Sequence, residues 1–171
     1  MQRRELLRVL GATTALALIP GEAFAAWTRV ASGVRPANGL TEAQLARVAA
    51  IADTILPRTD TPSASDVGVP DFVNVIVSEN YRDAERDAFV AGLEQIDPAE
   101  IASIESATDR RAEPARTYWR LKGLVVHGYF TSERVMKDVL HYEVMPGKFD
   151  GDAPMPLKSA RATRGGGHSH G

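Results

Sequence analysis

Apolar residues recur every three or four positions through the middle of the chain, which is the spacing of one face of an α-helix. The first such run has Leu45, Val48 and Ala52 on its apolar face. Thr41 and Gln44 stand before it in the order of a capping box, in which each side chain bonds the backbone of the other residue. The sequence therefore predicts a helix that begins after Thr41 and stops at Pro57.

The same spacing returns in four later segments, and no pair of alternating segments with a turn signal competes with it. Asp97 followed by Pro98 is typical of a helix start, and Thr131 and Ser132 can cap a last helix. We expect an all-α fold, an irregular bundle of five to six helices in one domain. The apolar positions of these segments are Phe72, Val75 and Ile76; Phe89, Val90, Leu93 and Ile96; Tyr118, Leu121, Val125 and Tyr129; and Val135, Met136, Val139 and Leu140.

Two stretches interrupt the helical pattern. Residues 57–70 contain three prolines, a glycine and several Ser, Thr and Asp residues, which predicts an ordered loop or a contact surface. After Tyr142 the chain is rich in Gly and Pro, and we expect an extended C-terminal arm that lies on a partner. The expected organisation is a signal at 1–25, a linker at 26–40, a helical domain at 41–151 and an extended or disordered tail at 152–171.

The first segment has the pattern of an export signal. Arg3 and Arg4 precede two leucines, a short apolar stretch follows, and Ala23-Phe24-Ala25 is a small-x-small cleavage pattern. The apolar stretch is shorter than the roughly 20 residues that span a bilayer. Because the paired arginines resemble the twin-arginine motif, we expect export in the folded state and a location in the periplasm.

Composition narrows the possible functions further. The chain has 171 residues, enough for one ordinary domain, and a net charge of -2 with no basic stripe, so we expect no nucleic-acid partner. It has no cysteine, which excludes disulfides, iron–sulfur clusters and covalent c-type haem. Any electron carrier of a complex would therefore belong to another subunit.

Few residues of the chain point to chemistry of its own. His127, His141 and Met145 could offer axial ligands to a haem or metal, which leaves open a free-standing periplasmic haem- or metal-binding module. The commoner interpretation is that the two histidines are satisfied by local hydrogen bonds or face a partner. His168 and His170 supply only two ligands in a Gly-rich tail.

The acidic residues around the Pro-rich loop also fit a structural role. Asp60 and Asp66 stand in turn-forming Asp-Thr-Pro and Ser-Asp-Val-Gly sequences, and no nucleophile or phosphate-binding loop accompanies them. We therefore assign no catalytic, cofactor-binding or metal-binding residue and expect no enzyme activity from the chain alone.

Two blocks of sequence resemble a known family. The first runs from Ile-Leu-Pro-Arg-Thr-Asp-Thr-Pro at 55–62 to Asp-Val-Gly-Val-Pro-Asp-Phe at 66–72. The second joins Gly-Tyr-Phe-Thr-Ser-Glu at 128–133 with the tyrosine, Pro-Gly and glycine pattern at 142–151. Over roughly residues 41–151 the chain is similar to the gluconate 2-dehydrogenase subunit 3 family, the small subunits of membrane-associated flavin dehydrogenases.

The resemblance implies a function in a complex. In that family the large subunit resembles glucose-methanol-choline oxidoreductases and binds FAD, and a cytochrome c subunit often accepts the electrons. The small subunit lends its twin-arginine signal to the large one. The resemblance thus implies a non-catalytic subunit that binds no cofactor itself and stabilises a periplasmic FAD-dependent sugar or glycoside dehydrogenase, with glucoside 3-dehydrogenases narrowly preferred. Such a subunit would contact the membrane only through the export signal or the complex. The other alternative function is an export chaperone that is released after translocation.

Contact with the partner is expected from the Pro-rich loop and from aromatic residues. A proline-rich loop loses little chain entropy on docking, and aromatic side chains are enriched at interface hot spots, although each aromatic could equally fill the core. The expected contact residues are Pro57, Arg58, Asp60, Pro62, Trp119, Tyr129, Phe130, Tyr142, Met145, Pro146 and Phe149.

Overall fold

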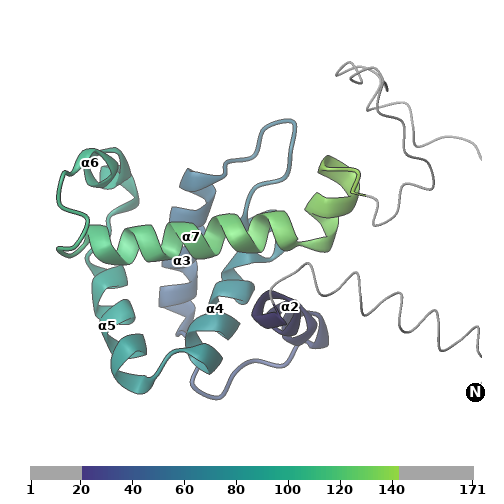
Figure 1. The fold of residues 1–171 in the computed structure, drawn as a ribbon, viewed down its shortest axis with the longest axis horizontal. Helices are drawn as coiled ribbons and strands as arrows, with labels where there is room; N and C mark the ends of the chain where they lie inside the picture. The colour runs from purple at the N-terminus through teal and green to yellow at the C-terminus, as the bar shows by residue number, and fades with distance from the viewer. Residues whose placement is uncertain (1–20, 143–171) are drawn as a thin grey trace, which may run out of the picture.

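Every regular element that the computed structural model describes, within residues 21–142, is a helix, which confirms the all-α prediction (Figure 1). The expected C-terminal arm and the tail at 152–171 lie outside these residues. The helices are α2 (Gly21–Ser32), α3 (Glu42–Ile55), α4 (Val69–Asn80), α5 (Asp83–Glu94), α6 (Ile101–Ser106) and α7 (Ala115–Thr131), with single turns η1 (Ser65–Val67), η2 (Pro98–Glu100) and η3 (Val135–Val139).

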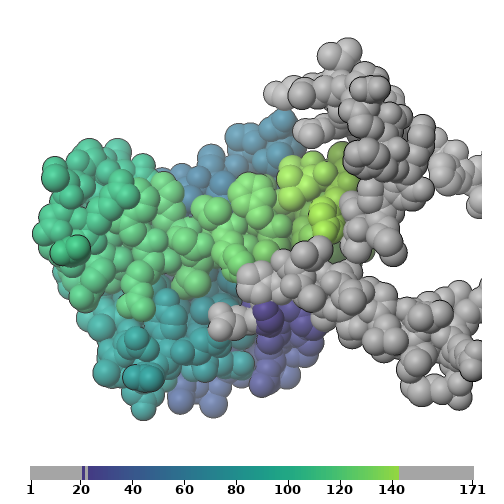
Figure 2. Space-filling model, in the orientation of Figure 1, coloured from purple at the N-terminus to yellow at the C-terminus, as the bar shows by residue number. Residues whose placement is uncertain are grey.

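The core is built around α4. Phe72, Val73 and Val77 are fully buried, because α4 contacts α2, α3 and α7 on different sides. Long α7 crosses α3 and α4, and α2 lies beside α4 near the carboxyl end of α7 (Figures 1 and 2). Burial on several sides explains why the apolar stripe of α4 is wider than the three positions that its spacing predicts.

The start of α3 is the predicted capping box. The Gln44 backbone N–H donates to Thr41 Oγ1 at 3.3 Å, and the Thr41 N–H donates to Gln44 Oε1 at 2.9 Å. Val48 and Ala52 are buried as expected, and Ile51 between them is buried as well. These contacts satisfy two backbone donors that a helix start leaves without partners.

Arg47 joins α3 to the end of α5. Its Nη1 donates to the carbonyl oxygens of Glu94 and Ile96 at 3.0 and 2.9 Å. The last carbonyls of a helix have no partner within the helix, so the guanidinium satisfies groups that would otherwise depend on water. The end of α5 is thereby fixed by a side chain from another helix.

Helix α7 packs against the core with the predicted line of residues. Tyr118, Leu121, Val125 and Tyr129 are all buried. A Cβ atom at Gly128 would lie 2.7 Å from Cδ1 of Phe72, so the absent side chain lets the Phe72 ring approach the backbone of α7.

Two elements differ from the expectation. The predicted linker at 26–40 is helical as far as Ser32, because α2 packs on the body; the domain boundary after Ala25 stays a prediction and lies within this helix. The predicted last helix is one π-helical turn, in which the Leu140 N–H donates to the Val135 carbonyl oxygen. Thr131 belongs to α7, where its hydroxyl donates to the His127 carbonyl oxygen. Of the two predicted capping residues, only Ser132 bonds the backbone that follows, because its hydroxyl accepts the Val135 N–H at 3.4 Å.

Candidate partner interface

The Pro-rich loop leaves α3 and returns to it. At its base, the Ala64 N–H donates to the Leu56 carbonyl oxygen at 3.1 Å. The Ser65 N–H donates to the Asp53 carboxylate at 2.8 Å. These two bonds hold both ends of the loop against the end of α3, so residues 57–63 form a fixed projection.

Asp66 organises the interior of this loop. Its carboxylate accepts a bond from the Ser63 N–H at 2.8 Å and a second from the Arg58 guanidinium. The Ser63 amide is the main reason that the pKa of Asp66 lies below its usual value; burial opposes this effect, and Arg58 and Arg134 add to it. The turn-forming interpretation of the Ser-Asp sequence is therefore confirmed.

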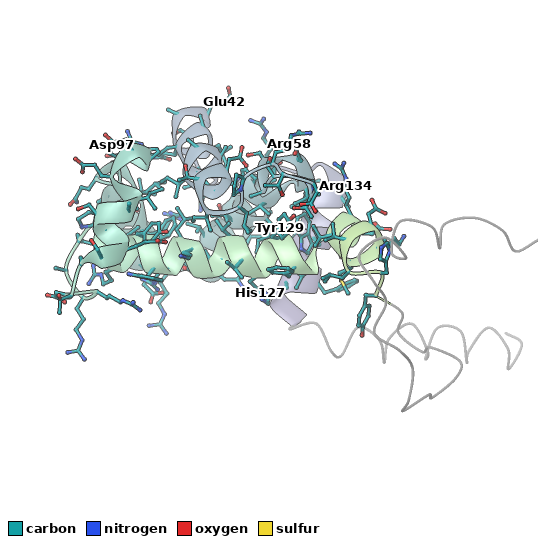
Figure 3. All side chains as sticks on the ribbon, turned by 90° about the horizontal axis from the view of Figure 1, so that it is seen from above. Glu42, Arg58, Asp97, His127, Tyr129 and Arg134 are labelled. Atoms are coloured by element: carbon teal, nitrogen blue, oxygen red, sulfur yellow. The ribbon has the colours of Figure 1, made fainter. Side chains whose placement is uncertain are left out.

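The loop is also tied to the last helices. The Tyr129 hydroxyl donates to the Pro62 carbonyl oxygen at 2.8 Å, and Arg134 Nη1 donates to the Asp66 carbonyl oxygen at 3.3 Å. Figure 3 places Arg58, Tyr129 and Arg134 toward the same end of the bundle. The loop and residues 129–134, two segments more than 60 positions apart in sequence, thus form one rigid unit.

We call this unit, with the last turn of α7 and η3, the loop end. Pro57, Arg58 and Asp60 are exposed at its tip, and Pro62 is half-buried above Tyr129. Large apolar side chains are exposed beside them: Phe130 and Leu140 at 46% and Tyr142 at 45%. Exposed aromatic residues next to a pre-ordered loop have the properties of a protein interface, because little chain entropy remains to be lost on binding.

Trp119 does not belong to the loop end. It lies eleven positions before Phe130 on α7, about 16 Å along the helix axis at 1.5 Å per residue. The Arg110 guanidinium stacks 4.0 Å from its ring centroid, and Lys122 lies 5.1 Å away. Its half-buried ring is thus covered by cations of its own chain, although Nε1 is buried without a partner.

A shallow hollow of about 400 Å³ lies at that other end, between the end of α3, α6 and α7. The Glu105 carboxylate accepts bonds there from the Tyr118 hydroxyl and from Lys122 Nζ. The bond from Lys122 is the main reason that the pKa of Glu105 lies below its usual value, whereas burial raises that of Tyr118. Glu105, Tyr118 and Lys122 are thus bonded to one another, and none of the three is free to act as an acid, base or nucleophile in this hollow.

The residues considered for haem or metal do not converge within residues 21–142. His127 is half-buried on α7 with its ring 6.2 Å from that of Phe72, and His141 is exposed after η3. No three acidic or histidine side chains gather as metal ligands in this part of the chain. None of its helices is long and apolar enough to cross a membrane.

The expected contact residues therefore divide into groups. Pro57, Arg58, Asp60, Phe130 and Tyr142 are exposed at the loop end, whereas buried Tyr129 and half-buried Pro62 act in holding the loop. The sequence did not reveal Arg134 and predicted a core position for Leu140. A basic residue two places after Phe-Thr-Ser and an apolar residue before a histidine carry no distinct signal. The expected residues that lie outside the described part are Arg3, Arg4, Met145, Pro146 and Phe149.

Comparison with known families agrees with the resemblance. Residues 42–101 match the family model of gluconate 2-dehydrogenase subunit 3, which confirms the resemblance to that family over about a third of the chain. The matched segment runs from α3 through the loop, α4 and α5 to the start of α6. No curated protein and no solved structure is significantly similar to the chain.

Proposed function

Because its residues 42–101 match subunit 3 of gluconate 2-dehydrogenase, we propose that this chain is the small, non-catalytic subunit of a periplasmic FAD-dependent dehydrogenase that oxidises a sugar or glycoside. The family match carries the proposal of a dehydrogenase subunit. The twin-arginine pattern at Arg3 and Arg4 supports export together with a folded flavoprotein partner.

We assign the docking surface to the loop end. The loop is held by hydrogen bonds from Tyr129 and Arg134, so its exposed tip is already ordered before a partner arrives. Phe130 supplies an exposed aromatic ring beside it. A preformed loop with a neighbouring aromatic anchor favours affinity because few groups must be immobilised on binding.

The test is co-purification of the full chain with the flavoprotein encoded beside it. We expect a yellow complex in the periplasm, and loss of both proteins from the periplasm when Arg3 and Arg4 are changed to Lys. A colourless chain that purifies alone, with the flavoprotein exported normally, would contradict the proposal. A Soret band from the chain purified alone would instead favour the haem-binding alternative.

The interface assignment needs a matched pair of variants. Phe130→Arg places a charge on the loop end, and Val34→Arg places the same charge on another exposed apolar residue, 57% exposed in the connection between α2 and α3. A central aromatic contact contributes about 2 kcal/mol or more, so Phe130→Arg should weaken the complex about 30-fold. Equal affinities of the two variants would exclude the loop end as the docking surface.

A further inference from the structure

Helix α2 begins before the predicted cleavage point and continues past it. The expected cut follows Ala25, in the middle of Gly21–Ser32. Within this helix Ala23 and Ala26 are 1% and 2% exposed, because they face the body, whereas Ala25 faces outward. One of the two small residues of the cleavage pattern is therefore buried in the fold.

Several contacts hold α2 in this position. The Trp27 ring stacks on Phe72 with centroids 5.1 Å apart, and its Nε1 donates to Thr131 Oγ1 at 3.0 Å. Arg29 lies 3.7 Å from the Glu79 carboxylate. Helix α2 is thus attached by aromatic stacking, by a hydrogen bond to α7 and by an ion pair with α4.

The Trp27 ring also packs against Gly68. Its φ of +79° suits glycine, and a Cβ atom there would lie 3.6 Å from the indole ring. The backbone between η1 and α4 therefore lies directly against Trp27. The contact comes from a glycine of the same loop region that forms the loop end.

We propose that the docking of α2 protects the Ala23-Phe24-Ala25 pattern from signal peptidase, so that the exported chain keeps the residues before Ala26. The peptidase reads the small residues of an extended segment, whereas here they are helical and Ala23 is covered. Cleavage requires α2 to unwind and to leave Phe72 and Thr131. This inference rests on the export signal of the proposed function, because a chain exported in the folded state meets the peptidase with α2 already docked.

The decisive measurement is cleavage of the purified full-length chain by detergent-solubilised signal peptidase, followed by intact mass. We expect the wild-type chain to remain uncut while a standard precursor in the same tube is processed. Rapid cleavage of the folded chain between Ala25 and Ala26 would overturn the inference. Export itself plays no part in this reaction, so failure of the proposed export and failure of this inference are distinguishable.

Two variants outside the signal release α2 without altering the cleavage pattern. Thr131→Val leaves the Trp27 indole N–H without its acceptor and should speed cleavage about tenfold, and Glu79→Lys opposes Arg29 and should speed it about threefold. Thr54→Val is the matched control, because the Thr54 hydroxyl donates to the carbonyl oxygen four residues earlier, as the Thr131 hydroxyl does, but it accepts no bond from Trp27.

Circular dichroism is the control for folding: each variant should give the same helical signal as the wild-type chain. If both releasing variants stay as resistant as the wild-type chain, docking is not what protects the pattern. If Thr54→Val is cleaved as fast as Thr131→Val, a general loss of stability explains the cleavage. Either result would overturn the inference.

Discussion

Gly128 and Gly123 offer a comparison within one helix. Gly128 faces Phe72, and a Cβ atom there would lie 2.7 Å from ring atom Cδ1. Gly123 is exposed, and a Cβ atom there would meet nothing within 4 Å. Changing each to Ala therefore adds the same methyl group to α7, once against the core and once into solvent.

The expected magnitudes follow from two opposing effects. Replacing Gly by Ala inside a helix stabilises it by about 1 kcal/mol, and Gly123→Ala should gain this amount. At Gly128 the carbon atoms must separate by roughly 0.8 Å to reach an ordinary contact of about 3.5 Å. Such overpacking costs about 1–3 kcal/mol. Gly128→Ala should therefore be less stable than Gly123→Ala by about 1–3 kcal/mol.

Urea unfolding of the full chain, followed by circular dichroism, measures both variants against the wild-type protein. The slope of the unfolding free energy with urea should stay the same, so that the midpoints report stability alone. A second readout is Trp27, whose ring stacks on Phe72 and should change its fluorescence only in Gly128→Ala. Equal stabilisation by both substitutions would refute the close approach of α7 and α4 at this glycine.

Three further predictions concern the loop and the contact between α5 and α7. Tyr129→Phe removes the donor to the Pro62 carbonyl oxygen, so we expect a loss of about 1 kcal/mol and faster hydrogen exchange in the loop with unchanged helix content. The folded-state pKa of Asp66 lies below the ordinary value of 3.8, so the charged carboxylate stabilises the loop fully above that pH and this stabilisation is lost as the pH falls through the folded-state pKa. Hydrogen exchange of the loop should therefore rise in acid, and Asp66→Asn should remove this pH dependence. Gly92→Ala places a Cβ atom 2.1 Å from Thr117 Oγ1 and should lower the urea midpoint, whereas an unchanged midpoint would contradict the α5–α7 contact.

Much of the helical body follows from local sequence signals. The capping box at Thr41 is closed by a residue three positions later, so local sequence predicts it. The line from Tyr118 to Tyr129 is visible in the spacing of its apolar residues, although distant helices bury it. The π-helical turn after Ser132 has the same apolar spacing as a short α-helix, and its different hydrogen-bond pattern could not be predicted from that spacing.

The site was less accessible to prediction because its contacts join distant segments. The composition of the loop predicts an ordered projection, but the anchoring of Pro62 by Tyr129 spans 67 positions. Tyr129 was expected both on the apolar line of its helix and at a partner surface. Only its hydrogen bond to the Pro62 carbonyl oxygen, made from a buried position, reveals that it holds the loop. For α2, the signal pattern around Ala23 gave no indication that the same residues pack against the body.

The hydrogen bond between Trp27 and Thr131 can form only late in the synthesis of the chain. The two residues are 104 positions apart, so α2 leaves the ribosome long before its acceptor on α7 exists. At about 5–20 residues per second the interval is roughly 5–20 s. During that time only the contacts with α4, at Phe72 and Glu79, are available to hold α2, and the completion of α7 adds the hydrogen bond.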